Sequence, residues 1–234
     1  MSPRPVPVMH SQYWWLAVLF TAGSTWAAGG EHSVSTATAA EIFGHPDLAK
    51  TIQAGWSSRP ELHEFLLDRL PASIAAARAL GCTSYTVRPR AGGGFVLTDP
   101  WGLTGWFEEV LRVETSDGWN ERVYVGEGSK RGLWFGPVTG AMAVSIRYRP
   151  DAGGMMAHQV RVAVQVKGLA SVVAKIFRGR IERYLESRLH GAAAQARAFC
   201  VKITGSPGST LDSLREARVL EPADLAEFER AIRK

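Results

Sequence analysis

Residues that could do chemistry are few in this sequence, and they complete no familiar catalytic pattern. A metalloprotease helix needs a second histidine one turn after His-Glu, and none follows His63 and Glu64. The glycine-rich stretch 126–132 follows a strand, but a strand pattern comes next, where a phosphate loop needs a helix N-terminus. No Gly-x-Ser-x-Gly elbow occurs. We therefore expect a surface histidine at position 63, a plain hairpin loop over 126–132, no catalytic residues, no metal site and no cofactor.

Four polar side chains remain that could face an apolar interior. His158 lies in an alternating valine strand, and Glu109 lies on the apolar side of another strand. A buried imidazole or carboxylate needs a partner, and the two together would form a general acid–base pair. Tyr148 and Tyr184 could orient a ligand hydroxyl. The alternative interpretations are a structural histidine, or one at a cavity mouth, and tyrosines that serve for packing.

The element that would position these groups is an antiparallel sheet. Between residues 82 and 167, strand-like segments rich in β-branched and aromatic residues alternate with short turns containing glycine and aspartate. Loops this short cannot carry the crossovers that parallel strands require. We expect about six or seven antiparallel strands, and an α+β fold in which this sheet wraps around a long C-terminal helix.

Alternation within the strands predicts which face is buried. Even-numbered residues are apolar over 142–148 and mostly apolar over 156–166, whereas the odd-numbered ones include arginines and glutamines. The even-numbered face should be the inner one. With the matching residues of 107–113 and of the following helix, the expected ligand-binding residues are Met142, Val144, Ile146, Tyr148, His158, Val160, Val162, Val164, Phe107, Glu109, Leu111, Phe177, Ile181 and Tyr184.

Helical periodicity flanks the sheet on both sides. A helix pair interrupted by Pro71 is expected over 60–80. A single amphipathic helix is expected over 169–203, with Gly179 and Gly191 as points where it could bend. Residues 204–234 should form a linker and a short helical appendage, which either caps the sheet or docks a partner.

The N-terminal segment predicts export. A short apolar stretch over 13–23 follows Arg4, and small residues precede a possible cleavage site after Ala27. As a helix this stretch would cover only about half of the ~30 Å hydrocarbon core of a membrane. We expect a cleaved signal peptide over 1–27, a flexible lead over 28–40, and a periplasmic or secreted protein.

Export affects how the charges and the two cysteines are interpreted. The chain carries 27 Lys and Arg against 22 Asp and Glu, scattered rather than in a block. This favours transient contact with an anionic membrane surface and disfavours nucleic acid. In an oxidising compartment Cys82 and Cys200 could form a disulfide, and two separate buried thiols are the alternative.

The order of these elements resembles the START-like superfamily, also called SRPBCC or polyketide-cyclase-like, over residues 41–203. The best match is the end of the domain, from Val144 through the strand Met156 to Lys167 and into the helix that follows Gly168. The resemblance implies an apolar cavity between sheet and helix that holds lipids, sterols or polyketides, without an invariant catalytic motif. The family's usual first strand is not evident, and 36–39 matches it poorly.

Three functions follow as hypotheses. The preferred one is a periplasmic protein that binds or carries a lipid-like hydrophobic ligand. The second is a cyclase, dehydratase or isomerase acting on a hydrophobic substrate, with His158 and Glu109 as acid and base. The third is an envelope assembly factor with a filled core.

Overall fold

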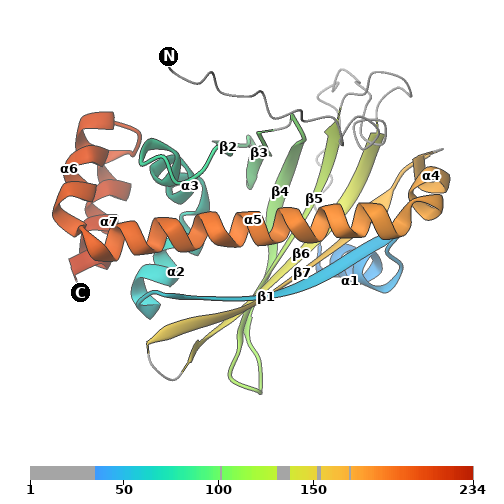
Figure 1. Cartoon of the computed structure of the whole chain (residues 1–234), viewed down its shortest axis with the longest axis horizontal. Helices are drawn as coiled ribbons and strands as arrows, with labels where there is room; N and C mark the ends of the chain where they lie inside the picture. The colour runs from blue at the N-terminus through green and yellow to red at the C-terminus, as the bar shows by residue number, and fades with distance from the viewer. Residues whose placement is uncertain (1–34, 101, 131–137, 152–153, 169, 234) are drawn as a thin grey trace, which may run out of the picture.

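Figure 1 shows a computed structural model, which describes residues 35–100, 102–130, 138–151, 154–168 and 170–233. The expected signal peptide over 1–27 and most of the expected lead lie outside these residues. The fold is α+β, as predicted: a seven-stranded antiparallel sheet with a long helix running beside it.

The bounds of the elements are as follows. The strands are β1 (Leu48–Ser57), β2 (Thr86–Pro89), β3 (Phe95–Thr98), β4 (Thr104–Glu114), β5 (Asn120–Lys130), β6 (Val138–Asp151) and β7 (Met155–Val166). The helices are α1 (Thr36–Gly44), α2 (Pro60–Asp68), α3 (Leu70–Ala79), α4 (Ala170–Ile176), α5 (Arg178–Gly205), α6 (Pro207–Ala217) and α7 (Pro222–Arg233). The expected helix pair over 60–80 is therefore present as α2 and α3.

The sheet has the strand order β1-β7-β6-β5-β4-β3-β2, so β2 to β7 form a meander and β1 is added beyond β7. Directly opposed residues of antiparallel strands share a face. In this register Val162 lies opposite Val144 and Lys50, so all three belong to the inner face, which is the one turned towards α5. The even-numbered parity predicted for 142–148 and 156–166 agrees with this register.

Strand β1 is the one that the sequence did not reveal. Only Leu48, Ile52 and Trp56 are buried, at every fourth position of the strand. Lys50 and Ala54 occupy the inner positions between them and are only half-buried. Lys50 extends to an ion pair with Glu186 on α5 at 3.0 Å. A strand that carries a cation on its inner face gives no clear alternation, which explains why the pattern was missed.

The expected hairpin loop over 126–132 is wrong over the residues that the structure describes. Gly126 to Lys130 continue strand β5, paired with β4 on one side and β6 on the other. The glycines permit close approach of the strands. A Cβ atom on Gly126 would lie 1.9 Å from the carbonyl oxygen of Trp106 and 2.9 Å from the ring of Phe107.

Strand β4 contains a bulge that alters its faces. The register shifts between Glu109 and Leu111, leaving Val110 as the extra residue. Glu109 therefore lies on the inner face, opposite Tyr124, but Leu111 lies opposite Val123 on the outer face. The prediction that Leu111 lines an inner cavity is wrong, because the bulge reverses the parity of the residues that follow it.

Helix α1 covers part of the outer face and begins inside the segment expected to be a flexible lead. Ser35 caps it by accepting a hydrogen bond from the backbone N–H of Thr38 at 3.3 Å. Its Ile42 is buried in a cluster with Val123 and Ala163 of the outer face. The folded domain therefore starts before Glu41, the residue at which the sequence predicted its start.

The single helix expected over 169–203 is divided in two. Its break is at Phe177, which separates α4 from α5, and not at Gly179 or Gly191, both of which lie inside α5. Figure 1 shows α5 running the length of the molecule, with α4 at one end and α6 and α7 at the other. The buried residues of α5 are Ile181, Phe199, Cys200 and Ile203.

The C-terminal appendage packs against the helix pair. Within the segment 204–234, expected to hold a linker and a short helical appendage, residues 207–217 form helix α6. Phe228 of α7 is fully buried between Phe65 of α2, with ring centroids 5.4 Å apart, and Phe199 of α5 at 6.4 Å. The guanidinium of Arg59 donates to the carbonyl oxygen of Ile232. The appendage thus closes one end of the fold.

In the part of the chain that the structure describes, no helix combines the length and the apolar character needed to cross a membrane.

A glycine pair tests this description of the sheet. Gly126→Ala should lower the free energy of unfolding by about 2 kcal/mol or more, because the new methyl group must displace backbone of β4. Gly191→Ala, in the interior of α5 with nothing within 4 Å of its Cβ position, should raise stability by up to about 1 kcal/mol. Urea unfolding of both variants measures the difference, and a neutral Gly126→Ala would contradict the paired strand.

Candidate functional site

Two histidines meet where α2 packs on the inner face of the sheet. His63 of α2 and His158 of β7 are 4% and 2% exposed, and their Nε2 atoms are 3.3 Å apart. One ring must donate and the other accept, so at most one Nε2 carries a proton. The expectation that His63 lies on the surface is wrong, because α2 turns this side of its first turns towards the sheet.

Aromatic rings enclose the pair. The indole of Trp56 stacks on His158 with centroids 3.6 Å apart, and the ring of Tyr148 lies 4.7 Å from that of His63. Burial is the main cause that lowers the pKa of His63 to about 3, and the charges of His158 and Arg122 add to it. Burial also lowers the pKa of His158 to about 4. Both imidazoles are therefore neutral at pH 7.

Beside the histidines lies a buried cation. Arg122 of β5 is fully buried on the inner face, opposite Ile146. Its guanidinium donates to Glu64 at 2.5 Å and to Asp68 at 2.8 Å, both on α2. It also donates to the hydroxyl of Tyr148 at 3.2 Å. Burial alone would lower the pKa of Arg122, but these hydrogen bonds outweigh it and raise the pKa.

Arg122, Glu64 and Asp68 form an ionic cluster, and Glu109 belongs to it rather than to the histidine pair. Its carboxylate accepts from Arg122 at 3.4 Å, from Arg112 at 2.7 Å and from the hydroxyl of Tyr124 at 3.2 Å. No hydrogen bond joins it to His158 among the residues described. The structure therefore does not form the acid–base pair that the sequence suggested.

A pocket of about 320 Å³ adjoins the histidines, between the helix pair, strand β3 and the second half of α5. Its wall is almost entirely apolar, and Trp56 and His63 belong both to this wall and to the aromatic cluster. The lining residues are Trp56, His63, Leu66, Leu67, Leu70, Ser73, Ile74, Ala77, Thr83, Tyr85, Leu97, Ala192, Gln195, Ala196, Phe199 and Cys200.

The few polar groups of the pocket differ in whether they are satisfied. Thr83 Oγ1 donates to Gln195 Oε1 at 2.6 Å. Ser73 is 6% exposed, and its hydroxyl has no hydrogen-bond partner among the described residues. Burial raises the pKa of Tyr85, so its phenol stays protonated. The hydroxyl oxygen of Ser73 has almost no accessible surface, so the side chain would have to rotate towards the pocket before a ligand atom could satisfy it.

None of the fourteen residues predicted to bind ligand lines this pocket. The buried ones are Tyr148, His158, Val162 and Ile181; Met142, Val144, Ile146, Val160, Val164, Phe107, Glu109, Leu111 and Tyr184 are half-buried, and Phe177 is exposed. Tyr184 accepts a hydrogen bond from Arg188 at 2.6 Å. The missed lining residues had one signal in the sequence, the apolar side of the pair over 60–80. Ala192 and Ala196 also line the space, but nothing in the sequence distinguishes them from other helix alanines.

The two cysteines are free thiols in the structure. Cys200 is buried and lines the pocket, and burial raises the pKa of its thiol to about 11. Cys82 is half-buried and packs against the hydrophobic cluster that contains Cys200, Phe199 and Phe228. Across the described residues, no three histidine, cysteine or acidic side chains are grouped so that they could hold a metal ion.

A pair of arginine variants tests the ionic cluster. Arg122→Ala should destabilise the protein by about 3 kcal/mol, because it removes a buried cation together with its hydrogen bonds to Glu64, Asp68, Glu109 and Tyr148. Arg112→Ala removes a cation that contacts two of the same carboxylates but is 52% exposed, so it should cost about 1 kcal/mol or less. Chemical denaturation provides both values, and equal losses would show that burial of Arg122 is not what matters.

The histidine pair predicts a pH dependence. Both pKa values lie below the ordinary value of 6.5, so as the pH falls below about 6.5 the unfolded chain takes up protons that the folded chain does not. Stability should therefore decrease from pH 7 towards pH 4, by up to about 1.4 kcal/mol per pH unit for each imidazole. Urea unfolding at several pH values should show a smaller slope for His63→Gln. An unchanged slope would contradict the assignment, and His190→Gln, at an exposed position of α5, is the control.

Comparison with known proteins gives similarity in structure alone. No family model and no curated protein matches the chain. A conserved protein from Geobacillus kaustophilus aligns with a TM-score of 0.43 at 11% identity, over 64% of this chain and 93% of that one. Ara h 8.0201 aligns with a TM-score of 0.34 at 15% identity, over 63% and 96%. The di-domain ARO/CYC BexL from the BE-7585A biosynthetic pathway aligns with a TM-score of 0.31 at 14% identity, over 69% and 53%.

These values support no conclusion about function. After helix α1 come a first strand, a helix pair, a meander and a long helix across the sheet. This arrangement, an antiparallel sheet packed against one long helix, is a helix-grip fold.

Proposed function

We propose that this protein binds a hydrophobic small molecule in the pocket between the helix pair, strand β3 and α5. The observation that supports the proposal is the pocket wall, whose exposed surface is almost entirely apolar and to which leucine, isoleucine, alanine and aromatic side chains contribute most. Binding sites for small molecules are concave and mostly apolar, with a few polar groups that orient the ligand. A histidine, a serine and a tyrosine are placed to do this here.

The size of the pocket limits the ligand. A methylene group occupies about the volume of one water molecule in the liquid, roughly 30 Å³, so about ten such groups would fill the space. The observed pocket is about 320 Å³. This fits one acyl chain of medium length or a compact ring system, and is too small to enclose a phospholipid with two long chains.

The hydroxyl of Ser73 suggests that the ligand has one polar end. A buried hydroxyl without a partner costs about 1–3 kcal/mol, and a ligand carbonyl or hydroxyl group would recover much of this. Tyr85 lines the same pocket and can donate a second hydrogen bond. The proposed ligand is therefore amphipathic, with an apolar body and one oxygen-bearing group.

Binding has more support than catalysis. The enzyme hypothesis required His158 and Glu109 to act together, and each is held by other partners. The role of a periplasmic carrier combines this binding with export. Export rests on residues 1–27, outside the described part of the chain, and stays a prediction.

Two alanines on the same helix test the proposal. Ala196 lines the pocket, so Ala196→Phe should fill part of it and weaken binding at least tenfold. Ala194 is exposed and does not line the pocket, so Ala194→Phe should leave affinity unchanged. The measurement is displacement of a fluorescent fatty-acid analogue by decanoate, with thermal unfolding to confirm that both variants fold. Equal affinities, or no binding to the parent protein, would contradict the proposal.

A further inference from the structure

Helix α4 exposes an apolar face that no described residue covers. Its Ala174 is buried against Leu48 and Ile181. Positions two residues away on an α-helix point to the opposite side. Val172 and Ile176 accordingly face outwards, with 56% and 70% of their surface exposed. Phe177, at the break before α5, is 40% exposed and extends the same patch.

Basic side chains lie beside this patch in the sequence. Lys175 lies on α4, and Arg178, Arg180 and Arg183 follow on the first turns of α5, all of them exposed. The two acidic residues of this stretch are engaged: Glu182 pairs with Arg178 at 2.8 Å, and Glu186 with Lys50 at 3.0 Å. Lys175 and Arg183 make no ion pair with any described residue. The stretch therefore carries a net positive charge next to exposed apolar groups.

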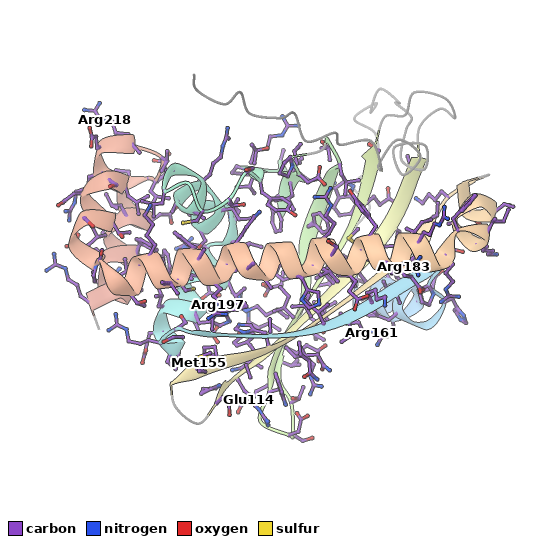
Figure 2. The ribbon with its side chains drawn as sticks, viewed as in Figure 1. Glu114, Met155, Arg161, Arg183, Arg197 and Arg218 are labelled. Carbon is purple, nitrogen blue, oxygen red and sulfur yellow. The ribbon has the colours of Figure 1, made fainter. Side chains whose placement is uncertain are left out.

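The patch is also accessible. Figure 1 places α4 at one end of the molecule, at the far end of α5 from the helices α6 and α7. Figure 2 shows Arg183 on α5 close to that end, whereas Arg197 lies towards the other. A surface at an end can meet a flat partner without obstruction from the sheet.

We propose that α4 and the first turns of α5 form a docking surface for an anionic lipid bilayer. In this arrangement Val172, Ile176 and Phe177 enter the boundary between head groups and acyl chains, and the basic residues contact anionic head groups. Exposed apolar residues combined with Lys and Arg are the pattern of helices that lie in a membrane interface. Each Lys or Arg near an anionic surface adds about 1 kcal/mol, which corresponds to about a fivefold gain in affinity.

This surface is separate from the proposed ligand pocket. The nearest lining residue of α5 is Ala192, and the helix rises about 22 Å between Phe177 and that position. Docking therefore goes beyond ligand binding: it would bring the protein to a membrane whether the pocket is empty or filled. The two proposals can fail independently.

Sedimentation of the full chain with vesicles tests the proposal. The protein should bind vesicles that contain one quarter phosphatidylglycerol, bind pure phosphatidylcholine at least tenfold more weakly, and dissociate as salt rises from 50 to 500 mM. Ile176→Ser should weaken binding about tenfold, and Val172→Ser should also weaken it. Lys175→Gln and Arg183→Gln should each weaken binding about fivefold.

Matched controls come from the far part of α5. Val201 is 54% exposed and Arg197 is exposed, so Val201→Ser and Arg197→Gln remove similar groups outside the patch and should leave binding unchanged. Absence of binding, equal binding to both vesicle types, or equal losses in the control variants would overturn the proposal. So would a dimer that forms without vesicles and is lost in Ile176→Ser, since a second copy would then be the partner of this surface. Circular dichroism confirms that each variant folds. If either Ile176→Ser or Val172→Ser fails to fold, the other still tests the apolar part of the patch.

Discussion

The position of the helix pair on the sheet depends on one desolvated charge. Arg122 is buried on the inner face, where a guanidinium without partners would be costly, and two of its partners, Glu64 and Asp68, lie one turn apart on α2. The charge can be buried only if α2 lies across β5 with these carboxylates turned inwards. That placement brings His63 against His158 and leaves the apolar side of α2 facing the pocket. The ionic cluster, the aromatic cluster and the pocket thus all follow from the packing of α2 on the sheet.

The sequence predicted the class of fold well because its strongest patterns are local. Alternation over β6 and β7 and the helical period after Gly168 each follow from a face that must be buried, and short turns exclude parallel strands. Alternation does not reveal Arg122 as an inner residue of β5. Val123 and Val125 are the apolar residues of that strand, so alternation favours them as inner residues, but they pack under α1 on the outer face. When both faces of a strand are covered, parity cannot tell which one is inner.

The pocket was beyond sequence reasoning for a different reason. The pocket lies where α5 is separated from the sheet. That separation depends on the packing of the helix pair and on β2 and β3, which are only four residues long. Small residues such as Ala192 and Ala196 line the space, but in a sequence they are indistinguishable from alanines that simply favour a helix. The break at Phe177 was likewise unmarked, because no proline or glycine occupies that position.

The wall between the pocket and the C-terminal appendage is shared. Phe199 lines the pocket and stacks on the ring of Phe228, while Leu66 and Cys200 belong to the same hydrophobic cluster as Ile232. Local opening of α7 would remove support from this wall, and a molecule seated against it would in turn resist that opening. A bound ligand should therefore slow hydrogen exchange of the α7 amides. Exchange in the last helix of the chain would then reveal a ligand that this helix does not contact.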